Sequence, residues 1–155
     1  MPKFLQLAVI SCLCLSQQAF AGWLFAKNEC SFEVWCAGAK NDGTFTEIRK
    51  VLPGQLYRSD LPAQNNNIGT VVKCAMNDAI HQPYQLEVNV ENGLTWLDLS
   101  SIDGNPFLGY HRHAEVNGGL CALDCPPGST ACEYPVTMTC KTQADATLYL
   151  CSQGP

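Results

Sequence analysis

Eight cysteines constrain the fold of this chain more than any other feature. The sequence contains ten, of which Cys12 and Cys14 lie in an N-terminal segment that we expect to be removed, so ten minus two leaves eight. An even number of cysteines in an exported chain of this size predicts a framework of up to four disulfides, although the spacing does not choose the partners. The eight are Cys30, Cys36, Cys74, Cys121, Cys125, Cys132, Cys140 and Cys151.

The N-terminal segment has the pattern of a secretory signal. Lys3 precedes the apolar run "FLQLAVISCLCL", and Ala19-Phe20-Ala21 fits a small-residue cleavage site before Gly22. The run is shorter than the roughly 20 residues that a membrane-spanning helix needs. We therefore expect a signal peptide at residues 1–21 and a single secreted domain at residues 22–155, monomeric and either extracellular or associated with the cell wall.

Charge and metal-ligand patterns narrow the range of partners. The formal net charge of −5 becomes −6 once Lys3 is removed, without a block of like charges, so neither nucleic acid nor an anionic membrane is an expected partner. The segment "CALDCPPGSTACEYPVTMTC" lacks the paired Cys-x-x-Cys hooks of a zinc site. His111 and His113 would share one face of a polar surface strand, but no third ligand is evident unless His81 approaches. We expect no metal and no cofactor.

Alternation with a period of two runs through most of the chain and predicts an antiparallel β-sandwich. Asn92-Gly93 is a hairpin turn signal between two of the predicted strands. We expect residues 61–69 to form a loop and residues 118–135 to form an irregular loop held by disulfides. The expected strands are residues 31–36, 44–52, 54–59, 69–76, 84–91, 94–100, 136–140 and 146–151.

Two carboxylates and a tryptophan are predicted to share the outer face of the hairpin that spans residues 84–100. The apolar residues of "YQLEVNV" and "TWLDLS" face the core, so Glu87, Trp96 and Asp98 face outward. Like charges that face each other on neighbouring strands destabilise a sheet. The presence of two such acids therefore favours a functional role for them. Two alternatives stay open: the acids are only the solvated back of a sheet, or Trp96 is covered by a loop or by a second sheet.

Several motifs resemble those of the thaumatin-like proteins, most closely the small fungal branch of yeast-phase-specific and antigenic proteins. They are "NECSFEVW", "LEVNV", "WLDLSSIDGNPFLG", "CPPG" and "DATLYLCSQGP". The resemblance implies a jelly-roll-like β-sandwich, a disulfide between Cys30 and Cys151, and an acidic cleft. It places cleft acids at Glu87, Asp98 and Asp103. The arginine of the family cleft has no counterpart, because Ile80 and His81 stand near its place.

These features predict a secreted binding protein rather than an enzyme. Its expected ligand is a polysaccharide of the β-glucan type, stacked on Trp96 and hydrogen-bonded by Glu87, Asp98 and Asp103. The alternative is a secreted effector, antigen or enzyme inhibitor that binds a host protein. A third hypothesis is a weak endo-β-1,3-glucanase in which Glu87 works with Asp98 or Asp103, as paired carboxylates do in glycoside hydrolysis.

Overall fold

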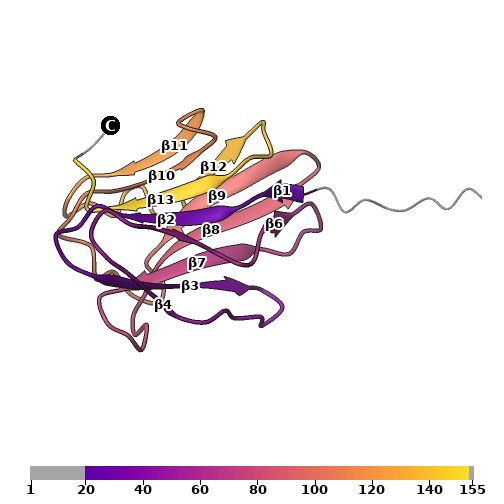
Figure 1. The fold of residues 1–155 in the computed structure, drawn as a ribbon. Helices are drawn as coiled ribbons and strands as arrows, with labels where there is room; N and C mark the ends of the chain where they lie inside the picture. Colours follow the sequence, from indigo (N-terminus) through magenta and orange to yellow (C-terminus); the bar gives the residue numbers. More distant parts are fainter. Residues whose placement is uncertain (1–19, 154–155) are drawn as a thin grey trace, which may run out of the picture.

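The computed structural model describes residues 20–153 and consists of two main β-sheets (Figure 1). Residues 1–19 of the expected signal peptide lie outside the described residues. One sheet has six strands, in the order β12 (Thr137–Cys140), β9 (Leu94–Ser100), β8 (Tyr84–Glu91), β7 (Thr70–Ala75), β3 (Val34–Lys40) and β4 (Arg49–Val51). The other has five, in the order β11 (Cys121–Cys125), β10 (Arg112–Val116), β13 (Ala146–Leu150), β2 (Leu24–Asn28) and β5 (Leu56–Arg58).

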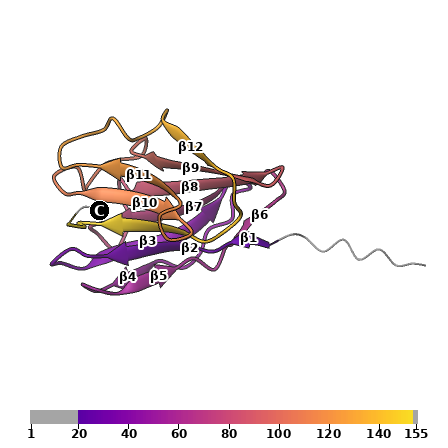
Figure 2. The same ribbon diagram turned by 90° about the horizontal axis from the view of Figure 1, so that it is seen from above.

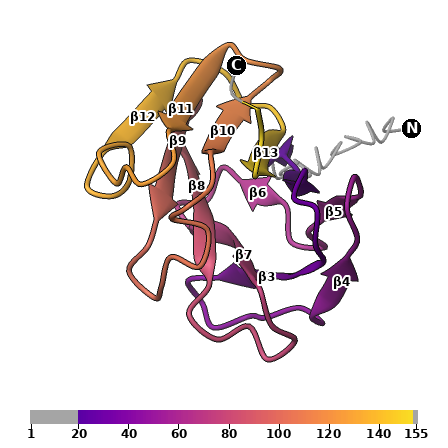
Figure 3. The ribbon, with the colours of Figure 1, turned by 90° about the vertical axis from the view of Figure 1, so that its left-hand side faces the viewer.

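A small third sheet pairs β1 (Phe20–Gly22) with β6 (Ala63–Gln64). Figure 3 shows the two large sheets curving around a shared interior, with β12, β9, β8 and β7 on one side and β11, β10 and β13 on the other. No helix among the described residues is long and apolar enough to cross a membrane. The expected all-β sandwich of thaumatin-like type is confirmed.

The core forms where the alternating residues of the two sheets meet. On β8 the side chains of Leu86, Val88 and Val90 are buried, and on β9 those of Leu97 and Leu99 are fully buried. Opposite them, the five-stranded sheet contributes its own inward-facing leucines, which belong to the same cluster. Because side chains alternate across a strand, burying these residues turns their neighbours outward. This is what aims Glu87 and Asp98 away from the core.

Four disulfides join the eight cysteines in pairs. Cys30 is bonded to Cys151, the pairing that the resemblance implies, and this bond closes the longest loop, with a sequence separation of 121. It lies beside the parallel pairing of β2 with β13, which run next to each other in Figure 2. The other pairs are Cys36–Cys74, Cys121–Cys140 and Cys125–Cys132.

Several strand predictions were wrong or displaced. Strand β2 was not predicted. Residues 118–135 are not wholly irregular, because a turn at Asn117-Gly118, both with positive φ, folds β11 back onto β10. The strand expected at residues 31–36 lies at Val34–Lys40, and those expected at 44–52 and 54–59 shrink to three residues each. The expected loop 61–69 contains the short strand β6.

Residues 112 and 113 begin strand β10, but Arg112 is buried in an ion pair and does not lie on the polar surface strand expected at residues 110–113. The Arg112 side chain is 0% exposed, and its Nη2 lies 2.8 Å from Oε1 of Glu133, which is 2% exposed. Nη1 of Arg112 also donates to the carbonyls of Phe107, Leu108 and Tyr110, while Glu133 accepts hydrogen bonds from Ser101 and Asn105. Both charges are therefore compensated by several partners, as burial requires.

Candidate ligand cleft on the six-stranded sheet

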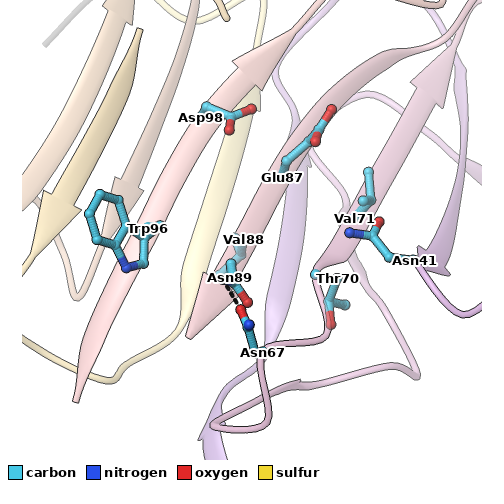
Figure 4. A pocket seen from close by; sticks show the side chains of 10 residues that line it. Asn41, Asn67, Thr70, Val71, Glu87, Val88, Asn89, Trp96 and Asp98 are labelled. Atoms are coloured by element: carbon cyan, nitrogen blue, oxygen red, sulfur yellow. Dashed lines mark hydrogen bonds between the residues drawn. The ribbon is translucent and has the colours of Figure 1, made fainter. Parts of the chain in front are cut away.

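The hairpin of β8 and β9 places Glu87 directly opposite Asp98. The two residues are Cα partners in the antiparallel register, and Asn89 is the partner of Trp96 one step along the same face. Figure 4 shows the two carboxyl groups side by side on neighbouring strands. The two acids therefore share one face of the hairpin, which is the placement that the alternation predicts. Directly opposed residues are the closest side-chain neighbours that two strands can offer.

The carboxylates line a hollow of about 210 Å³ over β7, β8 and β9. Its other polar walls come from amide and hydroxyl side chains, and Nδ2 of Asn89 donates to Oδ1 of Asn67 over 3.0 Å. The polar residues around the hollow are Asn41, Asn67, Thr70, Glu87, Asn89 and Asp98, with Trp96 beside them (Figure 4).

Asp98 is held in an environment that disfavours its charge. Burial, and secondly the negative charge of Glu87, raise the pKa of Asp98 from 3.8 to about 6. No lysine, arginine or histidine among the described residues forms an ion pair with either acid. Oδ1 of Asp98 is buried without a hydrogen-bond partner, as are Oγ1 of Thr70 and Oδ1 of Asn89 around the same hollow. These three buried oxygens belong to residues that line the hollow, and the described chain gives none of them a hydrogen-bond donor.

Asp103 lies in a second hollow of about 200 Å³, which shares Glu87 and Asn41 with the first. Its Oδ2 accepts from Nζ of Lys73 over 2.8 Å, so Asp103 is partly neutralised whereas Asp98 is not. The structure thus brings Glu87 and Asp98 into one hollow and places Asp103 in the adjoining one. Sequence reasoning missed Lys73, although the alternation in "GTVVKCAM" puts it on the same outer face as Glu87.

Trp96 stands at the rim of the cleft and is not covered by a loop or by a second sheet. It is 39% exposed, and its indole extends to the side of β9 away from Glu87 (Figure 4). Trp35, by contrast, is half-buried, with the ammonium group of Lys50 at 5.1 Å from its ring centre. An exposed indole next to unused acceptors is a surface on which a ligand can stack.

Within residues 20–153, one group of three side chains has the spacing of metal ligands, and it consists of Cys125, Cys132 and Glu133. The two cysteines are bonded to each other and Glu133 accepts from Arg112, so none of the three offers a free ligand atom. This group is part of the buried framework of the protein.

A family model matches this chain, and two of the solved structures that match it are described here. The model is Bys1, described as Blastomyces yeast-phase-specific protein, and it matches residues 12–152. The protein elicitor MoHrip2 from Magnaporthe oryzae is 20% identical, with a TM-score of 0.74 over 85% of this chain and 100% of that one. The thaumatin-like xylanase inhibitor TLXI is 18% identical, with a TM-score of 0.58 over 83% of this chain and 99% of that one. No curated protein sequence matches.

Proposed function

This chain belongs to the Bys1 family, a small fungal branch of the thaumatin-like proteins, and from that premise we propose that it is an exported binding protein for a neutral polysaccharide. The ligand class is a β-glucan-like polymer held over β7, β8 and β9. Export is supported by the four disulfides, which persist in oxidising compartments outside the cytosol.

The observation that carries the proposal is the half-buried carboxyl group of Asp98, which has no ion-pair partner among the described residues and whose Oδ1 accepts no hydrogen bond. A partly buried carboxylate without donors costs free energy, and the cost falls when a ligand in the hollow donates hydrogen bonds to the group. Sugar hydroxyls are such donors, and Glu87 presents further acceptors across the same hollow. The negative charges of the two acids would repel an anionic ligand. A neutral ligand rich in hydroxyl groups therefore fits this surface.

Trp96 supplies an apolar surface on which the ligand can pack. Sugar rings have flat C–H faces that pack on an indole, and the polymer would cross from this ring towards the second hollow at Asp103. The two hollows share Glu87, so they make a continuous path across the strands. An extended chain of sugars suits such a path better than a single monosaccharide does.

A second candidate function is weak hydrolysis of the same polymer, favoured by the raised pKa of Asp98. A carboxyl group with a pKa near 6 can donate a proton to a leaving oxygen in mildly acidic solution, while Glu87 serves as nucleophile or base. Hydrolysis requires a fixed separation between the two carboxyl groups, whereas binding does not. Binding is therefore the proposal that demands less of the geometry.

A protein partner is the alternative suggested by the two similar structures, an elicitor and a xylanase inhibitor. Exposed apolar side chains beside the cleft favour it, with Ile102 at 77% and Tyr134 at 63% exposure. The two segments are held together by the hydrogen bond from the amide of Tyr134 to the carbonyl of Leu99. This surface lies next to the cleft, so the experiment must distinguish binding of a protein at this surface from binding of a polysaccharide in the cleft.

Retention on insoluble β-1,3-glucan tests the proposal, with Trp96→Ala as the probe variant and Tyr134→Ala as the matched aromatic control. We expect the unmodified protein to be retained, Trp96→Ala to bind about 5- to 150-fold more weakly, and Tyr134→Ala to bind normally, because stacking on one aromatic ring contributes about 1–3 kcal/mol. Release of reducing sugar that is lost in Glu87→Gln would establish the hydrolase. Absence of retention on all glycans of an array would overturn the polysaccharide proposal.

A further inference from the structure

One of the four disulfides lines an open hollow at the surface. The hollow has a volume of about 390 Å³, and both Cys121 and Cys140 line it. Cys121 is half-buried, whereas Cys140 is 2% exposed. Leu120, a further lining residue, is mostly exposed. A small molecule that enters the hollow can therefore reach this disulfide from the side of Cys121.

The charge around this hollow favours an anionic reagent. Its lining includes the exposed cation of Lys141 and, among the described residues, no carboxylate. A disulfide is opened by a thiolate, which bonds to one sulfur while the other sulfur leaves as a thiolate. A nearby lysine stabilises a thiolate. Attack on Cys121 is therefore favoured, because it releases the thiolate of Cys140 directly beside Lys141. The lining residues are Leu120, Cys121, Thr139, Cys140, Lys141 and Thr142.

We propose that the Cys121–Cys140 disulfide is a site of thiol–disulfide exchange with an external anionic thiol of the glutathione class. The external thiolate bonds to Sγ of Cys121, and the bond between the two cysteines breaks with its electron pair on Sγ of Cys140. A second external thiolate then attacks the external sulfur of the mixed disulfide and releases the thiolate of Cys121. Two external thiols are thus oxidised to one disulfide, one protein disulfide is reduced to two thiols, and the protons pass between them through the solvent.

Two of the other disulfides are shielded from such a reagent. Cys36 and Cys74 are fully buried, and they lie on the neighbouring strands β3 and β7 inside the six-stranded sheet. Cys125 is fully buried and Cys132 is nearly so. Exchange requires access of the thiolate to a sulfur atom, so these two bonds should react only when the protein unfolds.

The bond between Cys30 and Cys151 has one half-buried cysteine, but its surroundings disfavour exchange. The residue before Cys30 is the exposed acid Glu29, whose negative charge repels an anionic thiolate. The chain after Cys151 is held in place, because Oγ of Ser152 is hydrogen-bonded to Nδ1 of His113 over 3.1 Å. If this bond opened, its two ends would stay close together and the bond would form again.

Opening the Cys121–Cys140 bond removes a covalent link between the two large sheets. Strand β11 ends the five-stranded sheet and β12 ends the six-stranded sheet, and Figure 3 shows the two strands side by side. Strand β12 has four residues and pairs in the described chain with β9 alone, where Thr139 is the Cα partner of Trp96. Reduction should therefore loosen the strand that supports Trp96 at the rim of the cleft.

Peptide mass spectrometry after mild reduction tests this site. The folded, exported protein is incubated with reduced glutathione at about pH 8, where part of the thiol is ionised, and free thiols are then blocked with iodoacetamide. We expect Cys121 and Cys140 to be alkylated about tenfold faster than the cysteines of the other three bonds, with a glutathione adduct on Cys121 at short times. The proposal is overturned if another pair is reduced first, or if Cys121 and Cys140 react only in urea that unfolds the protein.

Reversing the charge at Lys141 tests the class of thiol. Lys141→Glu should slow reduction by glutathione about 3- to 10-fold, because the hollow then repels the thiolate and solvent screens part of that repulsion. Reduction by the neutral thiol 2-mercaptoethanol should change less. The matched control Lys50→Glu alters the net charge equally on β4, at the opposite edge of the six-stranded sheet, and should not slow the reaction. Equal rates with glutathione for the two variants would overturn the assignment to an anionic thiol.

Hydrogen exchange measures the consequence for β12. In the double variant Cys121→Ala with Cys140→Ala, amide exchange at Thr137–Cys140 should be faster than in the unmodified protein, while exchange at Tyr84–Glu91 of β8 should not change. Circular dichroism shows whether the variant folds, and the selectively reduced and alkylated protein gives the same measurement if it does not. Unchanged exchange at Thr137–Cys140 would overturn the link between this disulfide and the edge of the cleft.

Discussion

Replacing Asp98 with asparagine should stabilise this protein at neutral pH. The pKa of Asp98 rises from 3.8 to about 6 through burial and the charge of Glu87. At about 1.4 kcal/mol for each tenfold change in acidity, this difference amounts to about 3 kcal/mol. Asp98 is only partly buried, and screening by solvent reduces the expected gain to about 1–2 kcal/mol. Asparagine keeps the shape of the side chain and removes the repulsion from Glu87.

The gain should depend on pH in a defined direction. The folded state binds the Asp98 proton more tightly than the unfolded state does, so the unmodified protein loses stability as the pH rises from about 4 to about 6. Below pH 4 the carboxyl group is protonated in both states, and the difference between the protein and Asp98→Asn should vanish. Above pH 6 the difference should be complete and constant.

Urea unfolding followed by circular dichroism measures the free energy of unfolding of the protein and of Asp98→Asn at pH 3.5 and at pH 7.5. Asp103→Asn is the matched control, because its carboxylate has the ammonium group of Lys73 at 2.8 Å and its loss should cost about 0–1 kcal/mol. An Asp98→Asn variant that is no more stable than the unmodified protein at pH 7.5, or equally stabilised at both pH values, would refute the reasoning about the two opposed acids.

Two further predictions concern the framework of the fold. Glu133→Gln should lower the free energy of unfolding by about 3–5 kcal/mol in urea titrations, because it leaves the guanidinium group of Arg112 buried without its counter-ion. A result within 1 kcal/mol of the unmodified protein would contradict this. Replacing Cys30 and Cys151 together with alanine should cost about 5 kcal/mol, from the entropy of a loop of 121 residues in the unfolded chain, and should lower the melting temperature in calorimetry.

The sequence predicted the strands best where alternation and turn chemistry agree. The bounds of β8 and β9 match the expectation at both ends, because Asn92-Gly93 with positive φ fixes the hairpin between them. Strand β2 was missed because its inward positions end in Asn28, a polar residue that is fully buried. The amide of Asn28 donates to the carbonyls of Phe32 and Val51, and Val51, which is 23 residues away, is a partner that a short pattern cannot reveal.

The candidate cleft was predictable only in the part that local alternation and the hairpin turn determine. Glu87 and Asp98 belong to one hairpin, so their register follows from local sequence. The pairing of Lys73 with Asp103 and the approach of Ser152 to His113 join residues 30 and 39 positions apart. These contacts depend on how sheets are ordered, which alternation does not specify.

The parallel pairing of β2 with β13 has a consequence for biosynthesis. Strand β2 is the first to enter the five-stranded sheet and β13 is the last, yet they are adjacent in it. That sheet therefore cannot close until residue 150 has left the ribosome. The two parts of the sheet stay separate until the last strand has been synthesised, which delays both the closing of the core and the bonding of Cys30 to Cys151.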